Sequence, residues 1–201
     1  MLQIDGSYGE GGGQILRTSL SLAAITRQPI RIDRIRANRK TPGLAIQHLT
    51  GVRAIGEICL AEIMGDALGS TTLEFVPTSA PIPGRYFFDV EQTLGRGSAG
   101  AVTLILQTLL LPLAQVQGQS ILRLKGGTHV AFSPSATYIE QVYLPMLRSM
   151  GVEASLNLKA WGWYPQGNGE IEVQIQGTTQ PLQGIECLER GELKQIQGVA
   201  V

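Results

Sequence analysis

Cysteine, aromatic side chains and net charge are all scarce in this sequence of 201 residues. Its two cysteines, Cys59 and Cys187, are too few and too far apart for a disulfide framework or a zinc site, so we expect a reducing, cytoplasmic location. Sixteen acidic side chains balance sixteen basic ones, which excludes a protein that coats nucleic acid through overall positive charge. The longest apolar run, residues 101–116, is about one helical turn too short for a bilayer, so no membrane partner is expected.

Glycine and positive charge are instead concentrated locally. With 43% hydrophobic residues, 25 glycines and 10 prolines, the composition predicts a globular chain of mixed helices and strands joined by tight turns. Residues 17–53 hold seven arginines and one lysine against a single acid, Asp33. We therefore expect a basic face on this part of the chain.

Hydrophobic periodicity predicts two successive βαβαββ units, at residues 1–84 and 85–178. In the first, strands are expected at residues 2–5, 29–36, 59–65 and 71–76, and helices at 14–26 and 44–57. In the second, strands are expected at residues 85–91, 120–125, 152–158 and 169–176, and helices at 101–116 and 135–149. Both units place a glycine cluster before the first helix and a proline near the start of the second. This favours a true repeat over the alternation that any α/β chain shows.

Residues 179–201 differ from both units. The pattern at residues 193–201 predicts a strand that enters a core just where the sequence stops. We therefore expect the start of a third segment, or of a small inserted domain, in a truncated protein.

A glycine cluster at residues 6–13 links the first strand to the first helix. Glycines allow backbone amides to converge on an anion, and the start of a helix adds a partial positive charge. The cluster therefore predicts a phosphate cradle, with a sharp turn that binds nothing as the alternative. Its one acid, Glu10, suits a metal ion or a helix end. Arg17 lies one turn beyond Gln14 on the same helix face and reaches the same anion.

A basic loop at residues 35–43 follows the second predicted strand. Its arginines, Arg36 and Arg39, suit a phosphorylated ligand because each offers paired donors to phosphate oxygens; a solvated loop is the alternative. Gln47 and His48 follow in the first turn of the next helix. There a histidine binds phosphate or acts as an acid, or else caps the helix or lies on the surface.

The second unit contains a dinucleotide-type pattern. Residues 95–100 fit G-x-G-x-x-G, but no acid occurs between Glu91 and Glu140 to hold a ribose, which weakens the interpretation as a nicotinamide enzyme. Gln107 is a lone amide in an apolar helix, where either a nucleotide or backbone groups satisfy it.

Two further loops of the second unit contain histidine or tryptophan side chains. The loop at residues 126–135 takes the place that the basic loop has in the first unit, and its His129 is either a ligand contact or simply exposed. Trp161 and Trp163 either stack on a base or form a hairpin that covers the core.

Several of these motifs, taken in order along the whole chain, resemble the RNA 3'-terminal phosphate cyclases. They are Gly9-Glu10-Gly11-Gly12-Gly13-Gln14-Ile15-Leu16-Arg17, Ile35-Arg36-Ala37-Asn38-Arg39 with Pro42-Gly43-Leu44, Gln47-His48-Leu49, Gly97-Ser98-Ala99-Gly100 with Leu106-Gln107-Thr108, and Gly126-Gly127-Thr128-His129. The resemblance implies an α+β sandwich of tandem βαβαββ units, each a four-stranded sheet with two helices, similar to the C-terminal domain of translation initiation factor three. The family has three such units and a small inserted domain.

The resemblance also implies a reaction and a site. A cyclase uses ATP and a divalent metal, Mg²⁺ or Mn²⁺, to convert an RNA 3'-phosphate into a 2',3'-cyclic phosphate, through a histidyl adenylate and an RNA adenylate, with release of AMP and pyrophosphate. By this resemblance Glu10 is the metal-linked carboxylate. The residues implied to hold the terminal phosphate or the triphosphate are Arg17, Arg36, Arg39, Gln47 and His48. Those implied to bind or border the nucleotide are Gly11, Gly12, Gly13, Gln47, Gln107 and Pro134.

One departure from the family concerns its nucleophilic histidine, which belongs to the third unit. Neither His48 nor His129 lies in the matching motif, so this chain is expected to bind ATP or RNA ends weakly and to form no covalent adenylate. A non-catalytic cyclase-like RNA-binding protein of ribosome biogenesis stays open, although the retained Glu10 and arginines argue against it. A dinucleotide-binding oxidoreductase is the weaker alternative, and the sequence leaves the oligomeric state open.

Overall fold

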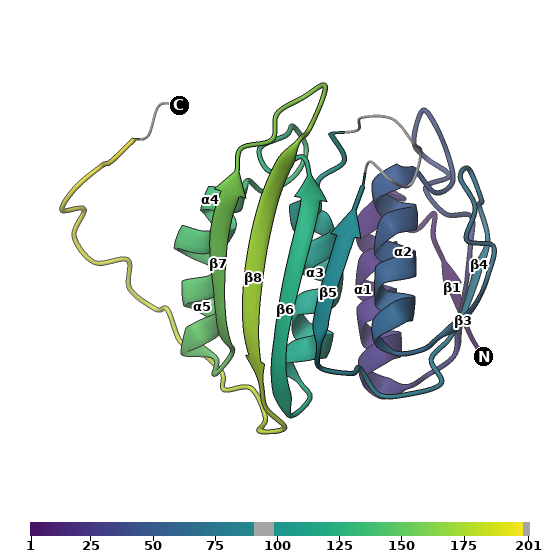
Figure 1. The fold of residues 1–201 in the computed structure, drawn as a ribbon, viewed down its shortest axis with the longest axis horizontal. Coiled ribbons are helices and arrows are strands. Elements are labelled where there is room, and N and C mark those ends of the chain that lie inside the picture. The colour runs from purple at the N-terminus through teal and green to yellow at the C-terminus, as the bar shows by residue number, and fades with distance from the viewer. Residues whose placement is uncertain (91–98, 199–201) are drawn as a thin grey trace.

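The fold is taken from a computed structural model that describes residues 1–90 and 99–198. Within these residues, eight strands form two four-stranded sheets, and helices pack on one face of each sheet (Figure 1). This confirms the predicted α+β fold with two repeated sheet units. The boundaries at residues 84 and 178 stay a prediction.

The first sheet has the strand order β1-β2-β4-β3, in which β1 and β2 are parallel and the remaining neighbours antiparallel. Its elements in chain order are β1 (Leu2–Asp5), α1 (Gly13–Thr26), β2 (Ile30–Asp33), α2 (Ile46–Ile58), β3 (Glu62–Met64) and β4 (Leu73–Val76).

The second sheet repeats this topology, with the order β5-β6-β8-β7 and the same parallel and antiparallel relations. Its elements are β5 (Arg85–Asp89), α3 (Val102–Ala114), β6 (Gly118–Gly126), α4 (Ala136–Tyr138), the π-helical turn η1 (Ile139–Tyr143), α5 (Leu144–Ser149), β7 (Glu153–Ala160) and β8 (Gly169–Gly177). The single helix predicted at residues 135–149 is thus interrupted by a π-helical turn. Pro145, which has no N–H to donate, lies two residues after the end of that turn.

One continuous hydrophobic core joins the two sheets. Along β8, Ile171, Val173 and Ile175 are buried while the residues between them are more exposed, the period of two that a strand with one buried face requires. Helix α3 is apolar on nearly all sides because it contacts α1 and α2 as well as β6 and β8. The helices therefore hold the two units together at their centre.

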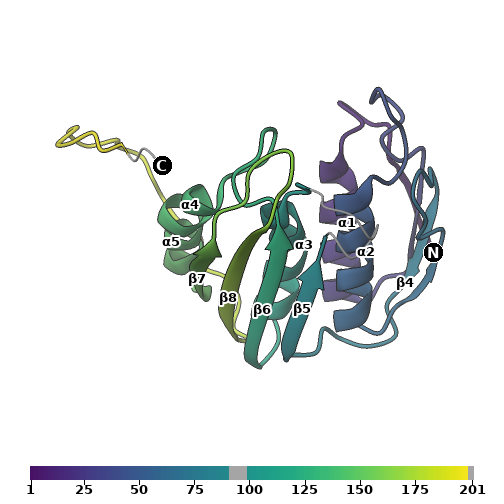
Figure 2. The ribbon, with the colours of Figure 1, turned by 45° about the horizontal axis from the view of Figure 1, so that its top comes forward.

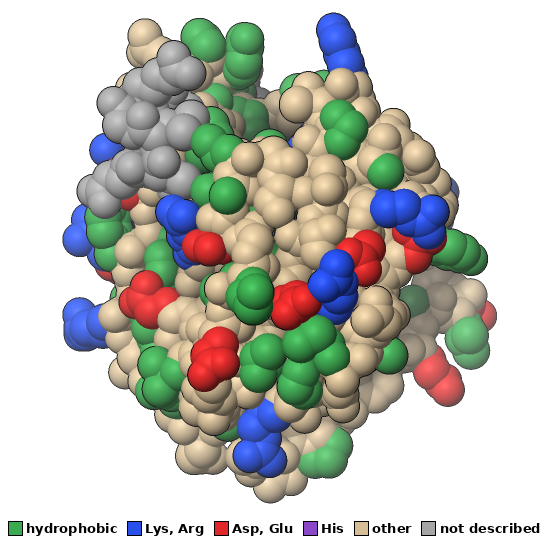
Figure 3. All heavy atoms as spheres, turned by 90° about the vertical axis from the view of Figure 1, so that its right-hand side faces the viewer, with side chains coloured by type: hydrophobic (Ala, Val, Ile, Leu, Met, Phe, Trp, Pro, Cys, Tyr) green, Lys and Arg blue, Asp and Glu red, His purple; other side chains and the backbone are tan. Residues whose placement is uncertain are grey.

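The outer face of the first sheet carries charged side chains among exposed hydrophobic ones, and several of the charges are paired (Figure 3). Arg31 lies 3.1 Å from Asp33 and 2.6 Å from Glu74, and Arg34 pairs with Asp5. The arginines of residues 17–53 are thus divided. Some are neutralised on this face, while others lie at the end of the unit where the loops after β1 and β2 meet.

The second strand ends three residues earlier than predicted. Arg34 and Arg36 adopt left-handed backbone conformations, with φ of 55° and 54°, which turn the chain out of the sheet after Asp33. Ile35 nevertheless stays buried, and its amide donates to the carbonyl of Thr71 at 2.9 Å. The apolar alternation therefore continues past the strand, which is why the pattern alone overestimated its length.

After β8 the chain first contacts the ends of α3 and α5, where the amides of Thr178 and Gln183 donate to the carbonyls of Ala114 and Met150, and it then runs away from both sheets (Figure 2). The strand predicted at residues 193–201 is wrong for the described part, because residues 193–198 are exposed and lie beside no strand of either sheet. Most of the G-x-G-x-x-G pattern at residues 95–100 lies outside the described residues. Within residues 1–90 and 99–198, the helices are too short or too polar to cross a membrane.

Candidate phosphate-binding site

A cavity of about 800 Å³ opens where α1 and α2 begin. Strands β1 and β2 are parallel, so the loops that follow them meet at the same end of the sheet. The cavity is lined by the glycine cluster, by cations from both segments and by a ring from the second unit: Tyr8, Gly9, Glu10, Gly11, Gly12, Gly13, Gln14, Ile15, Arg17, Arg36, Arg39, Gln47, His48, Leu104 and Phe132. The volume falls in the range of small-molecule sites.

The glycine cluster approaches the cationic side chains closely. A methyl group at Gly12 would lie 2.8 Å from Nη2 of Arg39. A methyl group at Gly13 would lie 2.4 Å from Nε2 of His48 and 2.9 Å from Nη1 of Arg17. Only glycine allows the backbone at the start of α1 to come this near to these groups. The amides at the helix start and the cations therefore face one space.

Three arginines line this cavity, and Arg39 among them is paired with Glu10. Among the described residues, neither Arg17 nor Arg36 forms an ion pair with an acid. Burial lowers the pKa of Arg17, and burial together with the charge of Arg39 lowers the pKa of Arg36. Nη1 of Arg36 donates to the carbonyl of Gly43 at 2.6 Å, which orients the guanidinium. An anion would relieve this crowding of like charge.

His48 is buried, with 8% of its surface exposed. Burial, reinforced by Arg36 and Arg17, lowers the pKa of His48 to about 3, so the imidazole is neutral at pH 7. Its Nδ1 has no hydrogen-bond partner among the described residues. The surface and helix-cap alternatives for this residue are therefore wrong. A neutral imidazole serves a ligand through hydrogen bonds, and not through a formal charge.

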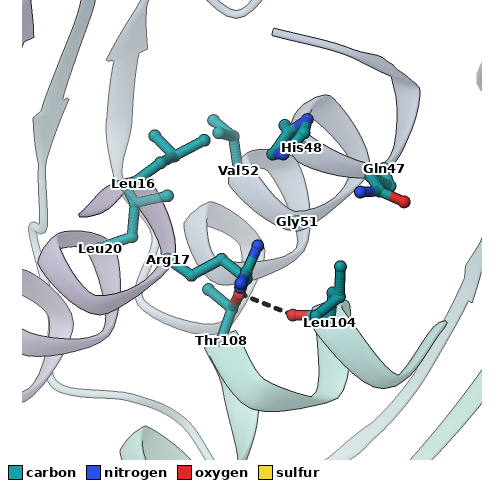
Figure 4. A pocket seen from close by; sticks show the side chains of 9 residues that line it. All are labelled: Leu16, Arg17, Leu20, Gln47, His48, Gly51, Val52, Leu104 and Thr108. Carbon is teal, nitrogen blue, oxygen red and sulfur yellow. Dashed lines mark hydrogen bonds between the residues drawn. The ribbon is translucent and has the colours of Figure 1, made fainter. Parts of the chain in front are cut away.

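A second, smaller cavity lies behind His48 between α1, α2 and α3 (Figure 4). It has a volume of about 10 Å³, and Arg17, Gln47 and Thr108 line it together with apolar side chains. Oε1 of Gln47 accepts from the amide of Ala101 at 3.1 Å, just before α3 begins. This contact links the cavity end of α2 to the second unit.

Glu10 is the one acid among the described residues that line the large cavity. Its side chain is largely exposed and its Oε2 lies 2.9 Å from Nη2 of Arg39. The described residues contain no cluster of three His, Cys, Asp or Glu side chains that would hold a metal by themselves. Mg²⁺ commonly takes one or two carboxylates and completes its shell with phosphate oxygens and water, so Glu10 fits such an ion only together with a phosphorylated ligand.

Two of the residues implied to border the nucleotide lie apart from this cavity. Gln107 is half-buried on α3, and within the described residues neither it nor Pro134 lines the cavity. The carbonyl of Pro134 accepts from Oγ1 of Thr103 at 2.7 Å. Instead, the fully exposed Phe132 of the same loop reaches the cavity, and sequence reasoning missed it. The feature of the sequence that could have indicated this residue is a large aromatic side chain in a loop, outside any predicted helix or strand.

Comparisons with known proteins point to one family. The family model described as RNA 3'-terminal phosphate cyclase matches residues 8–199. The chain is 66% identical over 200 residues to the RNA 3'-terminal phosphate cyclase of Nostoc punctiforme, 50% identical over 201 residues to that of Methylococcus capsulatus, and 46% identical over 201 residues to that of Sulfurisphaera tokodaii. All of this chain is covered, but it spans only 56–57% of the length of these relatives. The chain belongs to the RNA 3'-terminal phosphate cyclase family.

Proposed function

We propose that this chain provides the phosphate-binding part of an enzyme that converts an RNA 3'-phosphate into a 2',3'-cyclic phosphate at the expense of ATP, in the cytoplasm. The observation that supports this most strongly is the convergence of Arg17, Arg36 and the glycine cluster on one cavity without an acid partner for these two arginines among the described residues. Such a cavity favours a dense anion over a neutral ligand.

The proposed reaction brings several negative charges together. An RNA 3'-phosphate oxygen attacks the phosphorus of an enzyme-bound AMP, giving an RNA adenylate and releasing the enzyme group. The neighbouring 2'-hydroxyl then loses its proton and attacks the terminal phosphorus, the bond to AMP breaks, and the cyclic phosphate forms. Each step places charge on phosphate oxygens, so donors that are already oriented lower the barrier.

The roles that we assign follow the geometry of the cavity. Arg17 and Arg36 neutralise oxygens of the terminal phosphate, and His48, which is neutral, provides a hydrogen bond without further charge. Backbone amides of residues 11–13 complete the anion cradle. Glu10 would hold a divalent ion together with phosphate oxygens, and such an ion would polarise a P–O bond.

The test compares two arginines of the same turn. RNA ending in a 3'-phosphate or in a 3'-hydroxyl is titrated into the wild-type chain, Arg36→Ala and Arg34→Ala, with fluorescence anisotropy as the readout. We expect the wild type to prefer the phosphate end by about tenfold or more, and Arg36→Ala to lose that preference, since a charged hydrogen bond contributes about 1.5–3 kcal/mol. Arg34, which pairs with Asp5, serves as the matched control. Equal affinity of the wild type for both ends contradicts the proposal.

A second measurement concerns the covalent step. The chain contains two histidines, His48 and His129, and we assign the nucleophile to neither. After incubation with ATP, intact-protein mass spectrometry is therefore expected to show no AMP adduct on the 201-residue chain. An acid-labile adduct would reveal a nucleophile within it.

A further inference from the structure

Three rings gather on the surface of the second unit. Trp161 and Trp163 are parallel within 2°, with ring centroids 5.9 Å apart. The ring of His129 lies 4.5 Å from the first and 5.1 Å from the second. The tryptophans remain 41% and 48% exposed, so the hairpin that carries them does not bury them as a lid on the core. We call these three residues the aromatic cluster.

The backbone beneath the aromatic cluster is held in place. Gly162, between the two tryptophans, accepts from the amides of Thr128 and His129, each at 3.0 Å, and its own amide donates to Oγ1 of Thr128 at 2.9 Å. A methyl group at Gly162 would lie 2.4 Å from the carbonyl of Gly126. The rings are therefore fixed before any ligand arrives, which reduces the entropy lost on binding.

The aromatic cluster has no charge. Residues 126–138 and 160–169 contain no Asp, Glu, Lys or Arg. Nδ1 of His129 lies 2.9 Å from Oγ1 of Thr128 and its Nε2 lies 3.3 Å from Oγ1 of Thr137, and burial lowers its pKa. The imidazole thus packs against the two indoles with both ring nitrogens close to threonine hydroxyls. What this surface offers to a ligand is the faces of rings.

The aromatic cluster and the large cavity share one loop. The segment that follows β6 carries His129 in the cluster and, three residues later, Phe132 in the wall of the cavity. Figure 1 shows this loop and the β7–β8 loop at the same end of the molecule, where β6 ends. A chain whose terminal phosphate lies in the cavity can therefore pass along this loop toward the indoles.

We propose that the aromatic cluster is a stacking surface for unpaired bases of RNA just upstream of the 3'-phosphate. This inference rests on the function proposed above. Single-stranded nucleic acid is commonly bound by aromatic faces for the bases and by cations for the backbone, and stacking tolerates any base. In this protein the two tasks are divided: the first unit holds the phosphate, and the second unit holds the bases without a sequence preference.

The two tryptophans are the only ones in the chain, so all indole fluorescence comes from the aromatic cluster. We expect a single-stranded RNA hexamer with a 3'-phosphate to quench this emission. The same hexamer with abasic sugars next to the terminal nucleotide should bind about tenfold more weakly and leave the emission unchanged. Because the cluster is uncharged, this difference should persist as salt is raised, whereas overall affinity falls.

Variants separate stacking from folding. Trp161→Ala and Trp163→Ala should each weaken binding of the intact hexamer about tenfold and leave binding of the abasic hexamer unchanged, while Trp163→Phe should retain much of the affinity. Phe87→Ala is the matched control, since Phe87 is 49% exposed but lies on β5, outside both loops. If a tryptophan variant unfolds, the abasic comparison on the wild-type chain decides alone.

The outcomes distinguish this inference from the proposed function. If a 3'-phosphate increases affinity but abasic sugars and tryptophan variants change nothing, the stacking surface is refuted and the phosphate site stands. If bases matter but the 3'-phosphate does not, the proposed function fails instead. Quenching by ATP alone, with no effect of RNA bases, would mean that the cluster binds the nucleotide and would overturn the inference.

Discussion

The two sheets share one topology but differ in the loops at their functional ends. After β2, the loop carries Arg36 and Arg39, whereas the corresponding loop after β6 carries His129 and Phe132 and no charge. The two units also differ in the helix that follows, because α2 is regular and mostly buried while its counterpart is interrupted by a π-helical turn. The shared scaffold sets where the loops lie, and the residues in them decide what they bind.

The strongest expected effect is a loss of stability caused by a substitution in the hydrophobic core that the two units share. Leu109 on α3 is fully buried in the core that joins the sheets. Leu109→Ala should reduce the free energy of unfolding by about 2–5 kcal/mol, because it leaves a cavity in packed surroundings. Urea unfolding followed by far-ultraviolet circular dichroism and by tryptophan emission should show one transition. Two separate transitions would show that the units are independent.

A smaller effect is expected on the pH dependence of stability, and it comes from the buried histidine of the first unit. His48 has a pKa of about 3 when folded and an ordinary value near 6.5 when unfolded. The unfolded state therefore binds the extra proton, and stability falls as the pH drops below about 6.5. Between pH 7 and pH 5 the loss from this group is about 2 kcal/mol.

His48→Gln provides the comparison for that pH dependence. It should remove most of the loss of stability between pH 7 and pH 5, as measured by urea unfolding at each pH. His129→Gln should remove less of it, since the other histidine is only half-buried. An unchanged pH profile in His48→Gln would show that the imidazole is charged or solvated in the folded chain.

The glycine cluster gives the next prediction. Gly13→Ala places a methyl group against His48 and Arg17, so the affinity for 3'-phosphorylated RNA should fall about tenfold as the cations are displaced. Gly51→Ala on α2 is the control, because its nearest neighbour would lie at 3.8 Å. That change should stabilise the helix by about 0.5–1 kcal/mol without weakening binding. Equal affinities of both variants would show that the cluster is only a turn.

The smallest expected effect belongs to the paired arginines of the surface. Arg53 lies 3.0 Å from Asp66, and both side chains are well exposed. Arg53→Ala should change the free energy of unfolding by less than about 1 kcal/mol and leave RNA affinity unchanged. A large loss of affinity would mean that RNA also crosses this face, and the division between cavity and surface arginines would not hold.

Sequence patterns located the elements well and their ends less well. The helix at α1 and the buried strands followed from periodicity, because each has one apolar face. The end of β2 at Asp33 did not follow, since Ile35 stays in the core after the chain has turned at Arg34. Turns made by non-glycine residues in left-handed conformations leave little trace in a hydrophobic pattern.

The candidate site was predictable in part. The glycine cluster and the arginines near it could be anticipated, because residue type and loop position both indicate an anion. The burial of His48 could not, because it depends on packing between α1, α2 and α3. The contact of His129 with the two indoles was hidden for the same reason, because it joins two loops that are distant in the sequence. The hydrogen bond between Thr128 and Gly162, which connects the same loops, spans 34 residues.

The most direct measurement is a map of backbone amide chemical shifts in the 201-residue chain as a short RNA with a 3'-phosphate is added. The shifts are expected to concentrate on residues 10–17, 36–39 and 47–48, with a second group at residues 161–163, and the 3'-hydroxyl RNA should move the first group far less. Shifts confined to the outer face of the first sheet, or equal responses to both RNA ends, would contradict a phosphate site built by the first unit.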